Sequence, residues 1–491
     1  MGKVILVGGG PGDEGLITVK GLEAIKKADC IIYDRLSSLA LLDNAKKDCE
    51  FIYAGKENHH HTLKQDEINA LLVEKSKKYT TVVRLKGGDV YVFGRGGEEG
   101  AYLRNNGVEF EVIPGVTSAI AGLAYAGIPV TNRKVATGFR VVTAHNRLDE
   151  LADIDFSSIV KNIDKETCVF LMGLSKLGEI TEKLKEAGID KDIKMAVISN
   201  ATTPEQKTCI GNVENICDKV KEAGIKSPAL IVAGEVVSLR DKLNFYEEKP
   251  LFKRKYIVTK IGTEKSHITT LLESSGAYVK EIMTGEIENV YSAFDETFLE
   301  DLNWCLFTSR NAVKAFFEKI GHDRMDIRKL SNIKFAVVGD KTYDLLAGYG
   351  IYADMKSSKS DSGTFANELK AYVGKADKVC FFKADTADDT VESTLKDFCT
   401  YSEKIIYKNV DKIMDDRNSV DNIADYDGVF FTCASSVKRF FERYELDVKA
   451  KEKLNCLSIG AKTTNELKNI GIKNVSQAEK PDYIRLCELV L

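Results

Sequence analysis

Two polar loops near the N-terminus combine glycines with an acidic side chain, a pattern suited to ligand binding. The apolar run at residues 4–7 has the length of a buried strand and ends in Gly8-Gly9-Gly10-Pro11-Gly12-Asp13. A second loop, Lys86-Gly87-Gly88-Asp89, follows the β-branched run at residues 81–85. Glycine admits backbone angles that other residues avoid and lets a backbone approach a ligand closely. Asp89 can accept hydrogen bonds from hydroxyl or ammonium groups.

The glycine loops leave their ligand open when they are taken alone. The nicotinamide fingerprint Gly-x-Gly-x-x-Gly opens directly into a helix, whereas here Pro11 follows three glycines and Gly15 lies outside the expected register, so NAD is disfavoured. The first loop also fits a simple tight turn. Asp89 also fits a strand-to-helix turn in which its side chain caps the helix.

The elements that must position these loops form a strand–loop–helix–strand unit. We expect a helix over residues 18–27 and a second buried strand over 30–33 that ends at Asp34. Further strands are expected at 51–54 and 81–85. Ligands of open α/β sheets bind at the carboxyl ends of the strands, where Asp34 and both glycine loops would lie. The sequence therefore predicts an α/β fold with a site at this edge.

Three adjacent histidines follow Lys56 in the run Asn58-His59-His60-His61. Adjacent side chains do not all face one way on a regular element, and metal ligands are usually gathered from several elements. No partners with metal-ligand spacing are evident, so we expect a polar loop and no metal. His61 and Gln65, four residues apart at a helix start, are better candidates for substrate contacts.

Composition limits the classes of protein. The 491 residues predict two to four domains at about 150 residues each. A net charge of -4 argues against a nucleic-acid or anionic-membrane partner, and no apolar run approaches the roughly 20 residues that span a bilayer. The N-terminus leads straight into a strand, so we expect no signal peptide. Eleven cysteines without a Cys-x-x-Cys pair predict free thiols and a cytoplasmic protein.

A series of short motifs runs along the first half of the chain, and their joint order and spacing are specific. They are Val-Gly-Gly-Gly-Pro-Gly-Asp at 7–13, Tyr-Asp-Arg-Leu at 33–36, Arg-Leu-Lys-Gly-Gly-Asp at 84–89, Phe-Gly-Arg-Gly-Gly-Glu-Glu at 93–99, Pro-Gly-Val-Thr-Ser-Ala at 114–119 and Ala-Gly-Ile-Pro at 126–129. With these motifs, residues 2–246 resemble the uroporphyrinogen-III C-methyltransferases of the tetrapyrrole methylase family. The resemblance implies a two-lobed fold that uses S-adenosylmethionine and no metal. It implies cosubstrate contacts from Pro11, Gly87, Gly88, Asp89, Val92, Thr117, Ser118, Met172 and Ala201.

The same resemblance implies that Asp34 accepts a proton and Lys56 donates one. Arg35 and Arg95 are expected to bind substrate carboxylates, because a guanidinium group presents a planar fork to a carboxylate. Each assignment has a plain alternative. Asp34 also fits a helix N-cap, and Arg35, Lys56 and Arg95 also fit surface charges. Ala201 stands where the family commonly has glycine.

A charge-rich run with a proline at residues 247–253 is expected to link two domains. An internal repeat follows it. Phe-Thr-Ser-Arg-Asn-Ala-Val-Lys at 307–314 resembles Phe-Thr-Cys-Ala-Ser-Ser-Val-Lys at 431–438, and Val-Gly-Asp-Lys-Thr at 338–342 resembles Ile-Gly-Ala-Lys-Thr at 459–463. Two copies of a strand–polar loop–helix unit predict two similar α/β lobes. Hydroxyls and helix N-termini at the two facing edges would suit a polycarboxylate ligand, although each is also an ordinary helix cap.

Residues 254–491 resemble uroporphyrinogen-III synthase, which has two α/β lobes joined by a two-strand linker. The resemblance places the linker strands near 280–288 and 404–412 and implies that hydroxymethylbilane is the substrate. Tyr407 matches the family's hinge tyrosine; it could protonate the departing hydroxyl, and a structural role for it is equally open. Lys260 and Cys433 depart from the family pattern. Expected substrate contacts are Thr308, Ser309, Asn311, Thr432 and Ser435.

Together these resemblances predict a bifunctional enzyme. Its second half (254–491) would cyclise hydroxymethylbilane to uroporphyrinogen III, and its first half (1–246) would methylate that product twice, at C2 and C7, to precorrin-2 for cobalamin or sirohaem synthesis. The alternative is a methylase of another corrinoid substrate with a tetrapyrrole-binding module that lacks synthase activity. The methylase resemblance also implies a homodimer.

Overall fold

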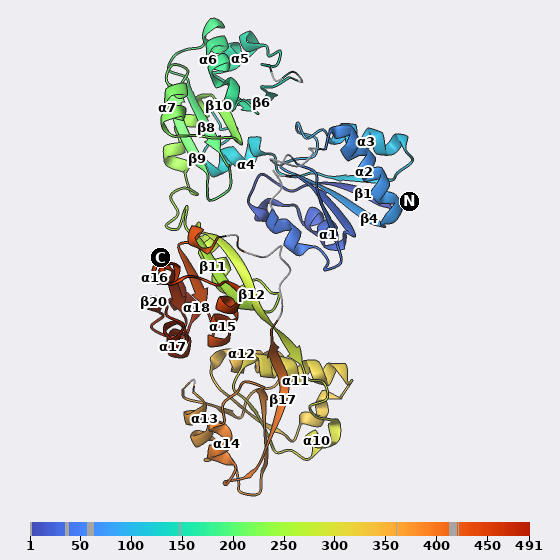
Figure 1. The fold of residues 1–491 in the computed structure, drawn as a ribbon, viewed down its shortest axis with the longest axis vertical. Coiled ribbons are helices and arrows are strands. Elements are labelled where there is room, and N and C mark those ends of the chain that lie inside the picture. Colours follow the sequence, from blue (N-terminus) through green and yellow to red (C-terminus); the bar gives the residue numbers. More distant parts are fainter. Residues whose placement is uncertain are drawn as a thin grey trace.

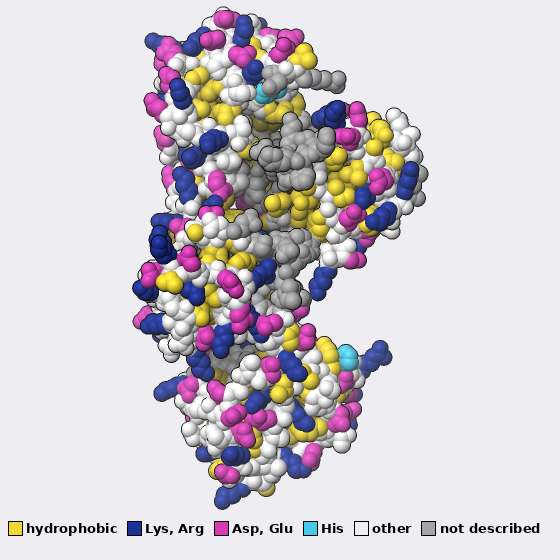
Figure 2. Space-filling model, viewed as in Figure 1, with side chains coloured by type: hydrophobic (Ala, Val, Ile, Leu, Met, Phe, Trp, Pro, Cys, Tyr) yellow, Lys and Arg dark blue, Asp and Glu magenta, His cyan; other side chains and the backbone are white. Residues whose placement is uncertain are grey.

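The computed structural model describes residues 2–34, 39–55, 63–146, 148, 150–359, 361–411, 420 and 422–491. The molecule is elongated, with the two lobes of the first half at one end and the two lobes of the second half at the other (Figure 1). Positive and negative side chains are interspersed over the face in Figure 2. Within the described ranges, no helix is long and apolar enough to cross a membrane. All eleven cysteines are free thiols, as predicted.

The first lobe is a five-stranded parallel sheet in the order β3-β2-β4-β1-β5. Its central strands are mostly buried because helices cover both faces, as parallel sheets require. Thr18 begins the first long helix by accepting a hydrogen bond from the Gly21 N–H. The elements are β1 (Lys3–Gly8), α1 (Val19–Lys27), β2 (Cys30–Tyr33), β3 (Glu50–Tyr53), α2 (Gln65–Lys78), β4 (Thr81–Lys86), α3 (Gly96–Asn105) and β5 (Phe110–Ile113).

The second lobe is a mixed sheet in the order β6-β7-β10-β8-β9. Helix α4 (Ser118–Tyr125) leads into it and packs its buried face against β8 and β10. The other elements are β6 (Gly138–Thr143), α5 (Phe156–Asn162), β7 (Glu166–Leu171), α6 (Leu177–Glu186), β8 (Lys194–Ser199), β9 (Lys207–Asn212), α7 (Ile216–Glu222), β10 (Ala229–Ala233) and α8 (Arg240–Leu243).

The second half is built on one ten-stranded sheet, ordered β15-β14-β13-β16-β17-β12-β11-β18-β19-β20. Its two five-stranded parallel halves are joined by one antiparallel pair, β12 with β17, which bridges the two lobes in Figure 1. The strands are β11 (Lys255–Ile261), β12 (Tyr278–Asn289), β13 (Trp304–Phe307), β14 (Lys334–Val337), β15 (Met355–Lys356), β16 (Lys378–Ala384), β17 (Thr400–Val410), β18 (Gly428–Phe431), β19 (Asn455–Ser458) and β20 (Asn474–Gln477).

The strand order confirms the predicted repeat and the two-strand linker. Read outward from the linker, β17-β16-β13-β14-β15 in one lobe corresponds to β12-β11-β18-β19-β20 in the other. The repeated motifs therefore occupy equivalent strand-to-helix turns. The lobe that contains β11 uses both ends of this half, as expected. The helices are α9 (His267–Ser274), α10 (Glu296–Glu300), α11 (Arg310–His322), α12 (Asp340–Gly348), α13 (Ser362–Leu369), α14 (Thr390–Leu395), α15 (Ala434–Arg443), α16 (Val448–Lys453), α17 (Ala461–Asn469) and α18 (Tyr483–Cys487).

The segment 247–253 between the halves is held at both ends. Glu247 accepts hydrogen bonds from Gln206 (2.8 Å) and Thr208 (2.6 Å) and pairs with Arg240 (2.7 Å), all in the first half. Leu251 is buried in the core of the second half. The chain therefore passes from one core to the other within a few residues.

Candidate functional site

The carboxyl ends of β1, β4 and β5 meet so closely that their loops must contain glycine. A Cβ atom at Gly8 would lie 2.5 Å from the Gly115 nitrogen and 2.7 Å from the Gly88 oxygen. Gly10 and Gly88 exchange two backbone hydrogen bonds, of 3.1 and 2.7 Å, and both have positive φ angles. The two glycine loops that the sequence singled out are thus one structure.

Asp89 organises this structure through both carboxylate oxygens. Its Oδ1 accepts the N–H groups of Tyr91 (2.8 Å) and Val92 (3.0 Å), and its Oδ2 accepts the Gly115 N–H (3.0 Å). The N-cap of α3 is Arg95, so Asp89 shapes the loop and does not cap the helix. A carboxylate retains further acceptor sites for a ligand.

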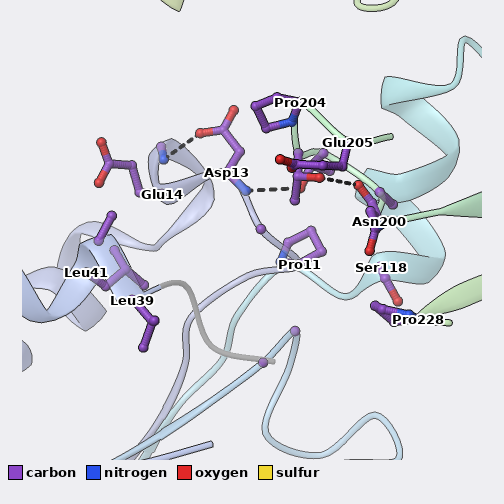
Figure 3. A pocket seen from close by; sticks show the side chains of 18 of the residues that line it. Pro11, Asp13, Glu14, Leu39, Leu41, Ser118, Asn200, Pro204, Glu205 and Pro228 are labelled. Atoms are coloured by element: carbon purple, nitrogen blue, oxygen red, sulfur yellow. Dashed lines mark hydrogen bonds between the residues drawn. The ribbon is translucent and has the colours of Figure 1, made fainter. Parts of the chain in front are cut away.

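A cavity of about 1960 Å³ lies beside these loops. It is lined by every residue predicted to contact the cosubstrate, from both lobes of the first half: Pro11, Gly87, Gly88, Asp89, Val92, Thr117, Ser118, Met172 and Ala201. Figure 3 shows Pro11 and Asp13 of the first loop facing Asn200, Pro204 and Glu205 of the second lobe. The predicted residues are therefore brought together by the fold.

The second-lobe wall of the cavity contains strained backbone. Met172, Asn200 and Thr202 have φ angles of 56°, 45° and 68°, a region that costs side-chain-bearing residues about 1–3 kcal/mol each. Asn200 and Thr202 flank Ala201, and Met172 directly follows β7. All three line the cavity where the second sheet borders it. Strain of this kind persists where a site requires a fixed backbone shape.

A bridge of hydrogen bonds joins the two lobes across one side of the cavity. The Asp13 N–H donates to Thr202 Oγ1 (3.0 Å), and the Tyr125 hydroxyl donates to Asp13 Oδ2 (2.6 Å). Burial and the neighbouring carboxylate raise the pKa of Tyr125, so its hydroxyl stays a donor. The first glycine loop is thereby fixed relative to the second lobe.

Asp34 lies on the cavity wall at the end of β2, with its side chain 24% exposed. The Arg84 Nη2 atom lies 3.2 Å from its Oδ2, and the Arg84 Nε donates to Glu99 Oε1 at 3.3 Å. Glu99 is fully buried and also accepts from Lys86 (2.8 Å) and Gln65 (3.2 Å). Burial and the charge of Arg84 lower the pKa of Lys86. Two cations and two carboxylates thus form one network, as buried charges require.

Sequence reasoning missed this network, although a signal was present. Arg84 and Lys86 alternate along β4, a strand whose other residues are mostly apolar and buried. Side chains two apart on a strand share a face, and buried cations need acidic partners. The pattern therefore indicated a buried charge cluster beside the second glycine loop.

Other predicted residues of the first half are placed differently. Arg95 lines the cavity but pairs with Glu98 on its own helix, at 2.9 and 2.7 Å. Arg35, Lys56 and His61 lie outside the described residues, so their predicted roles stay predictions. Among the residues that are described, no cluster of His, Cys, Asp and Glu could hold a metal ion.

In the second half, strand β17 connects the two repeated turns. Tyr407 and Asn409 are two residues apart, so their side chains lie on one face of the strand. The Tyr407 hydroxyl lies 3.0 Å from Ser309 Oγ in one lobe, and the Asn409 amide donates to Ser435 Oγ (3.5 Å) in the other. Arg439 fixes Asn409 by donating to its Oδ1 at 2.7 Å. The linker strand thus contacts the turns that begin both α11 and α15.

The repeated turns are not chemically equal. Ser309 caps α11 by accepting the Ala312 N–H at 3.1 Å, whereas Cys433, the N-cap of α15, makes no side-chain cap bond. The predicted contacts Thr308 and Thr432 are half-buried at equivalent positions after β13 and β18, and Asn311 is exposed on α11. Burial raises the pKa of Tyr407, so the phenol stays protonated at neutral pH.

Known proteins match both halves. The family model Tetrapyrrole (Corrin/Porphyrin) Methylases matches residues 3–217, and Uroporphyrinogen-III synthase HemD matches residues 266–488. The chain is 36% identical over 483 residues to the porphyrin biosynthesis protein HemD of Ruminiclostridium josui, covering 96% of this chain and 95% of that one. It is 50% identical over 242 residues to a uroporphyrinogen-III C-methyltransferase of Methanocaldococcus jannaschii, covering 49% and 98%. A uroporphyrinogen-III C-methyltransferase of Bacillus subtilis is 42% identical over 334 residues, covering 67% and 68%.

Proposed function

Since the chain belongs to the family that joins a tetrapyrrole methylase to a uroporphyrinogen-III synthase, we propose that its halves catalyse consecutive steps of tetrapyrrole synthesis. The second half cyclises hydroxymethylbilane to uroporphyrinogen III. The first half methylates that product at C2 and C7, giving precorrin-2 for cobalamin or sirohaem synthesis. We place the boundary between the two activities at residues 247–253, and we propose that the chain is a cytoplasmic homodimer.

The observation that carries the methylase proposal is the shared cavity. Residues predicted from separate motifs to hold S-adenosylmethionine line one space, with Asp34 on its wall. The lining fits such a cosubstrate: it combines the hydroxyls of Thr117 and Ser118, the Met172 thioether and closely approaching glycine backbone. S-adenosylmethionine supplies a methyl group already activated by a positively charged sulfur.

The chain's own residues then have four tasks. The cavity walls hold a pyrrole carbon of the tetrapyrrole in line with the methyl group and exclude water. Asp34 accepts the proton that the methylated ring must lose, because a carboxylate near that carbon is a suitable general base. Arg84 fixes the orientation of Asp34 through the 3.2 Å contact. Lys56 is assigned the role of proton donor by the resemblance.

For the second half, the supporting observation is the placement of Tyr407 and Asn409 beside the two repeated turns, in contact with Ser309 and Ser435 respectively. A protonated phenol at this point can donate to a departing hydroxyl. Hydroxyl groups and helix N-termini from both lobes can hold substrate carboxylates. Thr308, Ser309, Asn311, Thr432 and Ser435 are the proposed contacts.

A coupled assay tests both halves. The purified chain is given hydroxymethylbilane and S-adenosylmethionine without other enzymes, under anaerobic conditions, and products are followed by absorbance and mass. We expect precorrin-2. Methylated type-I products alone would leave the methylase and reduce the second half to a binding module, the alternative raised by Cys433. No transfer to supplied uroporphyrinogen III would favour a methylase of another corrinoid.

A further inference from the structure

The cavity of the first half does not end at its own lobes. Residues of β11, α9 and β12 and of the turn after β11, all in the second half, also line it, among them Lys260, Lys265, Thr269, Tyr278 and Lys280. β11, α9 and β12 belong to the same lobe of the second half as Ser435. The second half therefore contributes a surface to the space in which methyl transfer is proposed to occur.

Three ion pairs among the described residues connect the halves around this cavity, and in all of them the positive charge comes from the same half. The Lys265 Nζ lies 3.3 Å from Glu14 Oε1, and the Lys280 Nζ lies 3.8 Å from Asp43 Oδ2. The Lys255 Nζ lies 2.5 Å from Glu205 Oε1. In each of these pairs, the lysine belongs to the second half and the carboxylate to the first. Glu14 and Glu205 come from different lobes and both border the cavity in Figure 3.

The contact between the halves is polar and accessible to water. The buried apolar clusters of described residues each lie within one half, except that Leu251 of the connecting segment joins the second. The Lys265 and Glu14 side chains are 49% and 38% exposed, and those of Lys280 and Asp43 are 19% and 36% exposed. A partly exposed ion pair can exchange its carboxylate for that of a ligand, because the lysine stays hydrated and charged throughout.

We infer that the β11–α9–β12 face is a wall of the methylase's substrate chamber, and that Lys265 and Lys280 bind carboxylates of the tetrapyrrole during methylation. This inference rests on the proposed function. Lys265 Nζ also lies 2.8 Å from Glu273 Oε2 of its own half, so the substrate's carboxylates replace only the partners from the first half, Glu14 and Asp43.

The test measures methyl transfer to uroporphyrinogen III supplied directly to the full chain, so that the synthase step is bypassed. In the double variant Lys265→Gln/Lys280→Gln we expect the KM for uroporphyrinogen III to rise about tenfold or more, since two charge-assisted contacts are lost. The KM for S-adenosylmethionine and kcat should stay within about twofold. Lys329→Gln is the matched control: it removes an equally exposed ion pair, with Glu300, far from the cavity.

A second double variant separates ligand binding from attachment of the halves. Glu14→Gln/Asp43→Asn breaks the same ion pairs but keeps the lysines. If the lysines bind substrate, the KM for uroporphyrinogen III stays unchanged or falls. An equal rise of KM in both double variants, or no rise in the lysine variant, overturns the inference. A wild-type chain that does not methylate uroporphyrinogen III at all would instead refute the proposed function.

Discussion

At the scale of single residues, Arg84 is the side chain on which the first site depends. It is almost fully buried and lies between Asp34, which faces the cavity, and Glu99, which does not. Removing one partner of a buried charge network typically costs about 3–5 kcal/mol, because the other charge is left uncompensated. Arg84 therefore links the stability of the lobe to the orientation of the proposed general base.

Substitution Asp34→Asn should remove the base and keep the shape of the site. We expect kcat for methyl transfer to fall by about 10²–10⁴, because general base catalysis contributes this much. Affinity for S-adenosylhomocysteine, measured by calorimetry, should change less than about twofold. Asp48→Asn, at an exposed carboxylate of the same lobe, serves as control. A normal rate in the Asp34→Asn variant would show that Asp34 is structural.

The burial of Tyr407 predicts how stability and the synthase rate depend on pH. Its folded pKa lies above the ordinary value of 10.0 because of burial. Its contribution to stability is therefore complete below pH 10 and is lost as the pH rises through the folded pKa. Between pH 6 and 9 the phenol does not titrate, so we expect Tyr407→Phe to lower synthase kcat about 10–100-fold with an unchanged pH profile.

The matched control for that experiment is Tyr401→Phe. Tyr401 lies on the same strand but donates to Glu403 at 2.6 Å, away from the repeated turns. We expect its synthase rate to stay within about twofold of the wild-type rate. An alkaline limb below pH 9 that disappears only in Tyr407→Phe would contradict the assigned protonation state.

At the scale of elements, the first glycine loop depends on α4 for its position. The Tyr125 hydroxyl holds Asp13, whose N–H is bonded to the loop after β8. Substitution Tyr125→Phe removes a hydrogen bond to a charged group, worth about 1.5–3 kcal/mol. Part of that loss should appear as an about three- to tenfold weaker Kd for S-adenosylhomocysteine. Tyr102→Phe on α3 is the control, and equal affinities in both variants would refute the linkage.

A second prediction at this scale concerns the N-termini of α11 and α15. Cys433 has extended backbone angles at the cap position but provides no cap bond, whereas Ser309 does. Substitution Cys433→Ser should stabilise this lobe by about 0.5–2 kcal/mol, the usual value of an N-cap. Urea unfolding measures the gain, and Cys456→Ser, at a buried strand position, should destabilise instead.

At the scale of the whole molecule, the two halves have separate cores joined by a short segment and polar contacts. Cooperative unfolding follows shared apolar burial, so scanning calorimetry of the full chain should show two transitions. S-adenosylhomocysteine should raise only the transition of the first half, because a ligand stabilises the unit that binds it. A single transition that shifts as a whole would indicate that the ion pairs couple the halves strongly.

The sequence by itself determined the α/β class and the duplicated lobes, its motifs resembled those of the two families, and it predicted nine residues that line part of the first cavity. These follow from short-range patterns, because strand length, glycine loops and helix caps are local properties of the chain. The linker strands were also placed correctly, at residues 278–289 and 400–410.

Only the tertiary structure decided which charges face one another. Arg84 reaches Asp34 across neighbouring strands, and Lys280 reaches Asp43 across the two halves. Such pairs are distant in sequence, and their partners depend on how lobes pack, which no local pattern encodes. For the same reason, no sequence pattern indicated that the second half lines the cavity of the first.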